Sequence, residues 1–183
     1  MSRAPVGKLY KAGIQEALID MLKDQKDVLA AFNAHRVLYL VVGGHAVSIH
    51  AEPRGTKDLD VFIKPDEENS KAVFAALSEY GAPLAAMTPE DFNDKPTSVF
   101  QMGVEPGRVD ILQGIAGVTF DEAWKDRVEA FLDGEIPAHF ISREHLIQNK
   151  IAVGRLQDLA DVEKLRESAS TDPEATKDPG SEE

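Results

Sequence analysis

The stretch from Val37 to Ile63, VLYLVVGGHAVSIHAEPRGTKDLDVFI, constrains the fold more than any other part of the chain. It begins with an apolar run, Val37 to Val42, which is rich in β-branched residues and too short for a helix that spans a core, so it predicts a buried strand. Gly43 and Gly44 end this run. Because they have no Cβ, the backbone can turn sharply there and approach a ligand closely. The next residues predict a short helix that stops before Pro53.

Asp58 and Asp60 begin the next predicted strand, DLDVFI. Side chains at positions i and i+2 of a strand point to the same face, so the two carboxylates project together and raise each other's pKa. A divalent cation such as Mg²⁺ or Mn²⁺ removes this repulsion, because hard cations prefer carboxylate and phosphate oxygens as ligands. The alternative interpretation of Asp-x-Asp is a solvated turn at the mouth of a strand.

Positive groups surround the same stretch. The glycine pair places free backbone N–H groups at a helix N-terminus, where the helix dipole favours a phosphate. Arg54 and Lys57 add positive charge next to Asp58 and Asp60. This combination predicts phosphates on one side and metal on the other, which is the arrangement that nucleotidyl transfer needs.

These motifs resemble the nucleotidyltransferase superfamily with the DNA polymerase β-like catalytic core, in particular its small prokaryotic toxin-type and abortive-infection branches. The resemblance covers about residues 18–166 and rests on an apolar strand, Gly-Gly, Arg-x-Thr-x-Asp-x-Asp and a later third acid. It implies metal-binding and catalytic roles for Asp58, Asp60 and Asp110. It also implies a phosphate-binding group made of Gly43, Gly44, Arg54, Thr56 and Lys57.

Asp110 stands between Val109 and Ile111 in a predicted strand, so it faces away from its apolar neighbours. If that strand lies beside the strand of Asp58 and Asp60, three carboxylates converge. The resemblance then makes Asp110 a metal ligand that helps to deprotonate the attacking hydroxyl. The alternative is an ordinary exposed acid on a strand.

Two predicted C-terminal helices carry a further pattern, Lys150 followed by Arg155 and Asp158. By resemblance, Lys150 meets phosphates, and Arg155 and Asp158 brace the nucleotide pocket. In the alternative, Lys150 is a surface charge, and Arg155 with Asp158 is an i,i+3 helix pair worth only about 0.2–0.5 kcal/mol.

The resemblance implies a Mg²⁺- or Mn²⁺-dependent enzyme that moves a nucleoside monophosphate from a nucleoside triphosphate to a hydroxyl on RNA, protein or a small molecule. It also suggests a role in a toxin–antitoxin system with a cognate antitoxin-like protein partner. The alternative is a catalytically inactive nucleotide-binding or protein-interaction module of the same fold. That alternative has a basis in the sequence, since many active members have Ser after the first glycine, where this chain has Gly44 followed by His45.

Composition excludes several other classes of function. The 183 residues contain no cysteine, which excludes thiol catalysis, disulfides and thiolate zinc sites. The net charge of −12 argues against broad nucleic-acid binding, because phosphate contacts dominate that affinity. No apolar run approaches the ~20 residues of a membrane span, and no secretory signal is visible, so we expect a cytoplasmic protein without a membrane partner.

The pattern as a whole predicts an α+β fold with a mixed sheet of about five strands, flanking helices and C-terminal helices. Asp133-Gly134 predicts a tight hairpin, and Pro137 in its second arm predicts an edge strand. We expect a nucleotidyltransferase-like domain over 1–166 and a disordered acidic tail over 167–183, where Ser, Pro and acids replace the apolar pattern.

Overall fold

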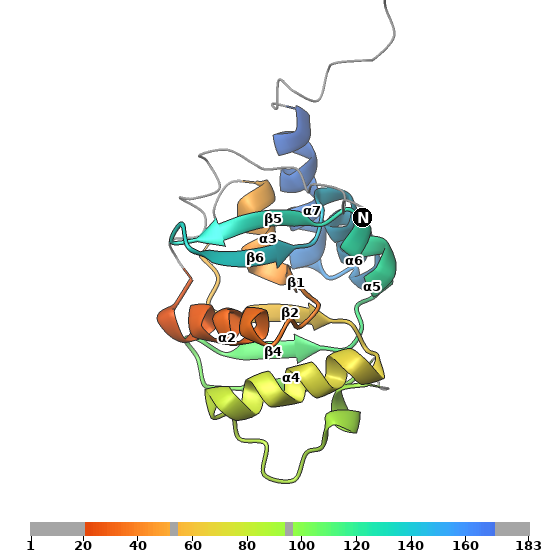
Figure 1. Ribbon diagram of the computed structural model, residues 1–183. Helices are drawn as coiled ribbons and strands as arrows, with labels where there is room; N and C mark the ends of the chain where they lie inside the picture. Colours follow the sequence, from red (N-terminus) through yellow and green to blue (C-terminus); the bar gives the residue numbers. More distant parts are fainter. Residues whose placement is uncertain (1–20, 52–54, 94–96, 171–183) are drawn as a thin grey trace, which may run out of the picture.

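The computed structural model describes residues 21–51, 55–93 and 97–170, and these form a six-stranded mixed sheet with helices on both faces (Figure 1). The α+β class is confirmed, with six strands in place of about five. The helices are α2 (Lys23–Ala34), α3 (Gly43–His50), α4 (Glu67–Tyr80), η1 (Pro89–Phe92), α5 (Phe120–Lys125), α6 (Arg143–Val153) and α7 (Leu156–Ser170). The strands are β1 (Tyr39–Val42), β2 (Leu59–Ile63), β3 (Val99–Met102), β4 (Val109–Leu112), β5 (Val128–Leu132) and β6 (Ile136–Phe140).

The strands lie in the order β3-β4-β2-β1-β6-β5, so β2 is central. It pairs antiparallel with β1 and parallel with β4, and β1 pairs parallel with β6. The outer pairs, β3 with β4 and β5 with β6, are antiparallel. The strand that carries Asp60 is therefore flanked by the strand that leads to the glycine pair and by the strand that carries Asp110.

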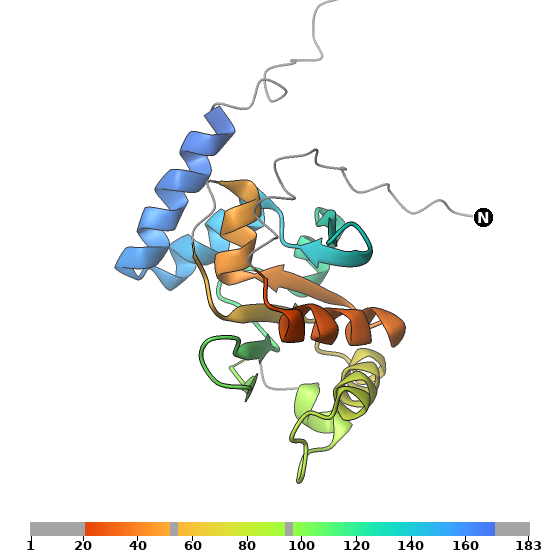
Figure 2. The ribbon, with the colours of Figure 1, turned by 90° about the vertical axis from the view of Figure 1, so that its left-hand side faces the viewer.

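Two helical layers enclose the sheet. Helices α2 and α4 lie on one side, and α3, α6 and α7 lie on the other (Figure 2). All four residues of β1 are buried, as expected for an apolar strand covered on both faces. The short helix expected after the glycines begins at Gly43 itself, so the glycine pair forms the first turn of α3.

Local sequence signals set the ends of the longer helices. Asp66 precedes α4, and its carboxylate accepts a hydrogen bond from the Asn69 N–H at 2.8 Å. Gly81 ends α4 in the left-handed conformation, at φ 87°, which glycine adopts without strain.

The expectation that Pro137 marks an edge strand is wrong. Its strand, β6, pairs on both sides, and β5 lies at the edge instead. Proline is tolerated there because β1 and β6 pair only at Val41 and Phe140, so no ladder on that side needs an N–H from Pro137. The Pro137 carbonyl accepts hydrogen bonds from side chains, Asn33 Nδ2 at 2.6 Å and the Tyr39 hydroxyl at 3.3 Å.

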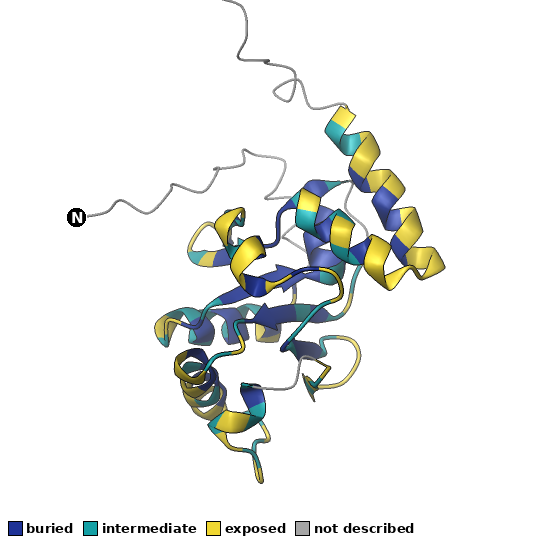
Figure 3. Cartoon of the chain, turned by 90° about the vertical axis from the view of Figure 1, so that its right-hand side faces the viewer, coloured by how far each residue is buried: buried dark blue, intermediate teal, exposed yellow. Residues whose placement is uncertain are grey.

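Helix α7 continues through Ser170, four residues into the segment expected to be a tail, and residues 171–183 lie outside the described part. The outer face of α7 is largely exposed (Figure 3). None of the described helices is long and apolar enough to cross a membrane.

Candidate active site

Three carboxylates gather where β2 and β4 run side by side. Asp60 of β2 is directly opposite Asp110 of β4, as the sequence pattern anticipated if the two strands were neighbours. Asp58 lies two residues before Asp60, next to the start of β2, and projects to the same side of the strand. We name Asp58, Asp60 and Asp110 the acid cluster.

The first turn of α3 presses against this cluster. Val42, the last residue of β1, pairs with Asp60, so α3 starts beside that carboxylate. A Cβ at Gly43 would overlap Asp60 Oδ2. Gly43 also has a φ of 62°, a conformation that residues other than glycine rarely adopt. Gly43 is thus required both by its conformation and by the closeness of Asp60.

Gly44 and Thr56 lie against each other on the same side. A Cβ at Gly44 would lie 2.5 Å from Thr56 Oγ1, and this hydroxyl donates to the Asp58 carbonyl at 3.5 Å. The N-cap residue of α3 is Val42, whose apolar side chain makes no capping hydrogen bond. The first N–H groups of a helix have no acceptor within the helix, so this uncapped end offers donors beside the acid cluster.

Arg108 bridges two members of the acid cluster, a role that the sequence reasoning missed. Its Nη2 donates to Asp58 Oδ2 at 2.8 Å, and its Nε lies 3.1 Å from Asp110 Oδ1 in an ion pair without hydrogen-bond geometry. Arg108 stands two residues before Asp110, so strand periodicity already placed both side chains on one face. That spacing was the signal that could have identified it.

Asp60 is the acid that Arg108 does not pair. Burial raises the pKa of Asp60 to about 6, and the charges of Asp110 and Asp58 add to the increase. Lys150 and Arg108 oppose this shift without cancelling it. The uncompensated negative charge of the cluster is therefore concentrated at Asp60.

A second ionic group lies between α6 and α7. Lys150 Nζ is 3.1 Å from Asp158 Oδ1 and 2.8 Å from Asp161 Oδ2, and all three side chains are at most 7% exposed. Arg155 pairs with Asp158 from outside, at 2.7 Å, and its own side chain is 75% exposed. We name these four residues the helix-pair cluster.

The helix-pair cluster faces the acid cluster. The charge of Lys150 lowers the pKa of Asp60, and the charge of Asp60 raises the pKa of Arg155, although its pairing with Asp158 contributes more. Helix α3 packs against both α6 and α7 and so stands between them and the sheet. The C-terminal helices therefore form one wall of the site.

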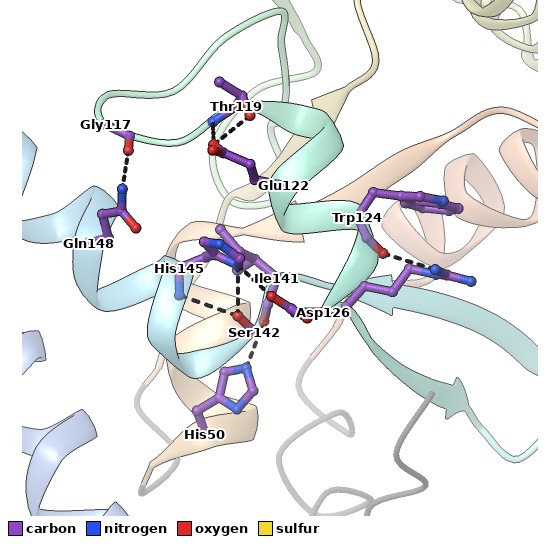
Figure 4. A network of polar contacts seen from close by, with 11 residues as sticks. His50, Gly117, Thr119, Glu122, Trp124, Asp126, Ile141, Ser142, His145 and Gln148 are labelled. Atoms are coloured by element: carbon purple, nitrogen blue, oxygen red, sulfur yellow. Dashed lines mark hydrogen bonds and ion pairs between the residues drawn. The ribbon is translucent and has the colours of Figure 1, made fainter. Parts of the chain in front are cut away.

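Hydrogen bonds fix α6 in this position (Figure 4). His50 of α3 donates from Nε2 to the Ile141 carbonyl at 2.7 Å, and burial lowers the pKa of this histidine to about 4, which keeps it neutral near pH 7. Ser142 caps α6, and its hydroxyl accepts a hydrogen bond from the His145 N–H. Gln148 Nε2 donates to the Gly117 carbonyl at 2.5 Å and ties α6 to the loop before α5.

A protein-family model described as nucleotidyltransferase of unknown function (DUF6036) matches residues 16–177, which include both clusters. The chain belongs to this nucleotidyltransferase family. No curated protein matches the chain in sequence.

Two solved structures resemble the fold of this nucleotidyltransferase. The lincosamide antibiotic adenylyltransferase LnuA, with lincomycin bound, has a TM-score of 0.51 at 17% identity, covering 80% of this chain and 97% of that chain. The antibiotic-resistance factor ANT(2'')-Ia also has a TM-score of 0.51, at 13% identity, covering 87% of this chain and 85% of that chain. At these identities the likeness concerns the fold alone.

The structure brings together most of the residues that the sequence nominated for this nucleotidyltransferase. The three acids, Gly43, Gly44 and Thr56 surround the end of β1, and Lys150, Arg155 and Asp158 form the facing wall. Arg54 lies outside the described residues. Lys57 is exposed, and its carbonyl accepts a hydrogen bond from Gln25 Nε2 at 2.9 Å. Asp161, like Arg108, was not nominated.

The acid cluster fits a divalent cation by the chemistry of its donors. Asp58 Oδ1 and Asp110 Oδ1 are buried and accept no hydrogen bond within the described residues, and carboxylate oxygens are preferred ligands of Mg²⁺. As they stand, no three acid or histidine side chains of the described segments are positioned to hold one ion together. The guanidinium of Arg108 contacts two of the acids instead.

Proposed function

We propose that this nucleotidyltransferase moves a nucleoside monophosphate from a nucleoside triphosphate to a hydroxyl acceptor, with Mg²⁺ or Mn²⁺, and releases pyrophosphate. The register of β2 and β4, which sets Asp60 opposite Asp110, carries the proposal. The uncapped first turn of α3 beside Asp60 supports it, because carboxylates for a cation and N–H donors for phosphates then share one edge of the sheet.

In this proposal Asp58, Asp60 and Asp110 hold the cation, which supplies charge neutralisation for the phosphates and the leaving group. Asp110 also accepts the proton of the acceptor hydroxyl. The hydroxyl oxygen forms a bond to the α-phosphorus as the bond to the pyrophosphate breaks. The transferred group thus ends on the acceptor, and the proton ends on the carboxylate.

The phosphate-binding roles follow the same geometry. The Gly43 and Gly44 N–H groups and the Thr56 hydroxyl lie beside the acid cluster, and Arg54 and Lys57 remain predicted phosphate ligands. Arg155, which immediately precedes α7, and Asp158 in its first turn are proposed to brace the pocket. Lys150 would have to leave Asp158 or Asp161 before its ammonium could reach a phosphate.

The acceptor is RNA, a protein or a small molecule. A small-molecule acceptor has support from LnuA, whose structure was determined with lincomycin and whose fold this chain resembles. A place in a toxin–antitoxin system would add an antitoxin-like protein partner. An inactive nucleotide-binding module is the competing function, favoured by Gly44 followed by His45 in the first turn of α3 and by Arg108 within the acid cluster.

The test is transfer of label from each of four α-³²P nucleoside triphosphates, with Mg²⁺ or Mn²⁺, to acceptors in a lysate of the source cell and to a panel of lincosamides such as lincomycin. Asp58→Ala and Asp60→Ala should abolish transfer while the fold is kept, and the exposed Glu163→Ala of α7 serves as the control that keeps it. The class of molecule that carries the label identifies the acceptor.

Two results would contradict the proposal. Transfer that survives Asp58→Ala would remove the acid cluster from the chemistry. Absence of transfer, with nucleotide binding retained and dependent on metal, would favour the inactive nucleotide-binding module.

A further inference from the structure

Arg108 stands where the proposed function needs a cation. Its guanidinium lies between Asp58 Oδ2, at 2.8 Å, and Asp110 Oδ1, at 3.1 Å, and so already supplies positive charge to two of the three acids. With all groups ionised, three carboxylates and one guanidinium leave two negative charges, which one divalent cation would balance. A further cation between Asp58 and Asp110 would have to compete with Arg108 for the same oxygens.

We propose that Arg108 is an internal competitor of the metal, holding the place between Asp58 and Asp110 until a divalent cation displaces its guanidinium. The inference rests on the proposed function, because it takes these acids to be metal ligands. It assigns to Arg108 the role of setting the cation concentration at which the acid cluster becomes fully occupied.

The contact to Asp110 is suited to displacement. Although Arg108 Nε is 3.1 Å from Asp110 Oδ1, neither atom has a hydrogen-bond partner in the described residues, so the attraction is electrostatic and lacks directional hydrogen bonding. The side chain of Arg108 is 33% exposed, which leaves it a path into solvent. A cation with a higher charge can therefore replace it without opening the core.

An alternative partner for the displaced guanidinium lies beside it. Glu105 Oε1 is 4.0 Å from Arg108 Nη1, and the Glu105 side chain is 68% exposed. The backbone stays fixed meanwhile, because the Arg108 carbonyl accepts a hydrogen bond from the Leu59 N–H at 2.9 Å, which joins the residue before β4 to the start of β2. Only the side chain has to turn, from Asp58 and Asp110 toward Glu105.

The test is equilibrium binding of Mn²⁺ without nucleotide, followed by electron paramagnetic resonance and titration calorimetry on the full chain. Removing the competitor in Arg108→Gln should tighten Mn²⁺ binding by about 10-fold, because the binding-competent form becomes the dominant one. Arg127→Gln is the matched control, since Arg127 is also partly buried and paired with one acid, Glu129 at 2.9 Å, and it should leave the affinity unchanged.

A double-mutant cycle keeps the test independent of folding defects in Arg108→Gln. Glu105→Gln removes the alternative partner and should weaken Mn²⁺ binding about 3-fold in the wild-type background, but should have no effect beside Arg108→Gln or Arg108→Ala. An equal loss in both backgrounds would mean that Glu105 acts on the cation directly, and would overturn the displacement step.

The two proposals fail differently. If Mn²⁺ binds and Asp60→Asn removes the binding, but Arg108→Gln leaves the affinity equal or weaker, the competitor role is wrong and the metal site stands. If neither the wild-type chain nor Arg108→Gln binds Mn²⁺, the metal site itself is wrong, and both proposals fall together.

Discussion

The acid cluster and the helix-pair cluster have the same arrangement of charges and differ in their exposure to solvent. The acid cluster is open to solvent, and the helix-pair cluster is closed to it. In each, one basic side chain lies between two aspartates: Arg108 between Asp58 and Asp110, and Lys150 between Asp158 and Asp161. Arg108 is 33% exposed and Asp58 25% exposed, whereas Lys150 is 7% exposed and Asp161 fully buried. The acid cluster also contains a third carboxylate that its basic residue does not pair.

The pKa of Asp158 in the helix-pair cluster and the pKa of Asp60 in the acid cluster shift in opposite directions. Burial by itself would raise the pKa of Asp158, but hydrogen bonds from Arg155 and Lys150 outweigh it and lower the pKa. At Asp60 burial and two neighbouring carboxylates act in the same direction and raise the pKa to about 6. The helix-pair cluster is therefore a charge-balanced ionic network of two cations and two carboxylates that joins α6 to α7, and the acid cluster is an unbalanced one that a ligand can complete.

The largest effect on stability should come from removing the shared cation of the helix-pair cluster. Lys150→Met leaves Asp158 and Asp161 buried without their shared cation, which should lower the free energy of unfolding by about 3–5 kcal/mol. Urea denaturation measures the change, with the exposed Lys164→Met of α7 as the control. A loss below about 1 kcal/mol would show that water replaces Lys150 and that the helix-pair cluster is accessible to solvent.

The sequence predicted the acid cluster because its signals are local. Two-residue periodicity placed Asp58 with Asp60 and oriented Asp110, and the short apolar strand with Gly-Gly located the start of α3. Arg108 obeyed the same periodicity, but which of the acids it contacts depends on the parallel pairing of β2 and β4. A pairing of strands distant in sequence is decided by packing of the whole sheet.

The helix-pair cluster was less predictable for the same reason. Arg155 with Asp158 was readable as an i,i+3 pair, and that pair exists. What converts it into a buried network is Lys150, which arrives from another helix once α6 and α7 pack together. The wrong edge-strand assignment of Pro137 has a parallel cause, because the short pairing between β1 and β6 is a property of the assembled sheet.

The next largest effect on stability should come from adding a side chain at Gly43, which tests how tightly Asp60 of the acid cluster packs against α3. Gly43→Ala combines a strained φ with an overlap between the new Cβ and Asp60, and should cost about 2–3 kcal/mol. Gly81→Ala is the control for strain alone, since its φ is 87° and no atom lies within 4 Å of an added Cβ. If both variants lose the same stability, the Asp60 side chain moves freely and does not abut α3.

Removing the charge of Asp60 from the acid cluster should raise stability, whereas removing the charge of Lys150 from the helix-pair cluster should lower it. Between the ordinary pKa of 3.8 and the raised value of about 6, folded Asp60 binds a proton that the unfolded chain releases, so stability falls as pH rises through this window. Asp60→Asn should therefore stabilise the metal-free protein by about 1–2 kcal/mol at pH 7 and remove this fall.

Urea denaturation of Asp60→Asn between pH 4 and pH 8 measures both effects, with the exposed Glu163→Gln of α7 as the control. The same protonation should weaken Mn²⁺ binding by the wild-type chain below about pH 6, because a protonated carboxyl is a poor ligand. A destabilised Asp60→Asn at pH 7 would mean that the negative charge of Asp60 is compensated in the folded state.

The smallest effect on stability is expected at Arg155, the exposed member of the helix-pair cluster, where a role in stability and a role in nucleotide binding can be told apart. Arg155 pairs with Asp158 at 2.7 Å, but its side chain is 75% exposed, so Arg155→Ala should cost no more than about 0.5 kcal/mol in urea denaturation. Its charge nevertheless lies within the field of Asp60, and the proposed function makes it a brace of the nucleotide pocket. We therefore expect Arg155→Ala to weaken nucleotide binding by about 10-fold, measured by calorimetry, while the exposed Arg166→Ala of α7 changes neither quantity. Unchanged nucleotide affinity in Arg155→Ala would reduce Arg155 to a surface partner of Asp158, and the contribution of the C-terminal helices to the site would then rest on the buried Lys150 of α6.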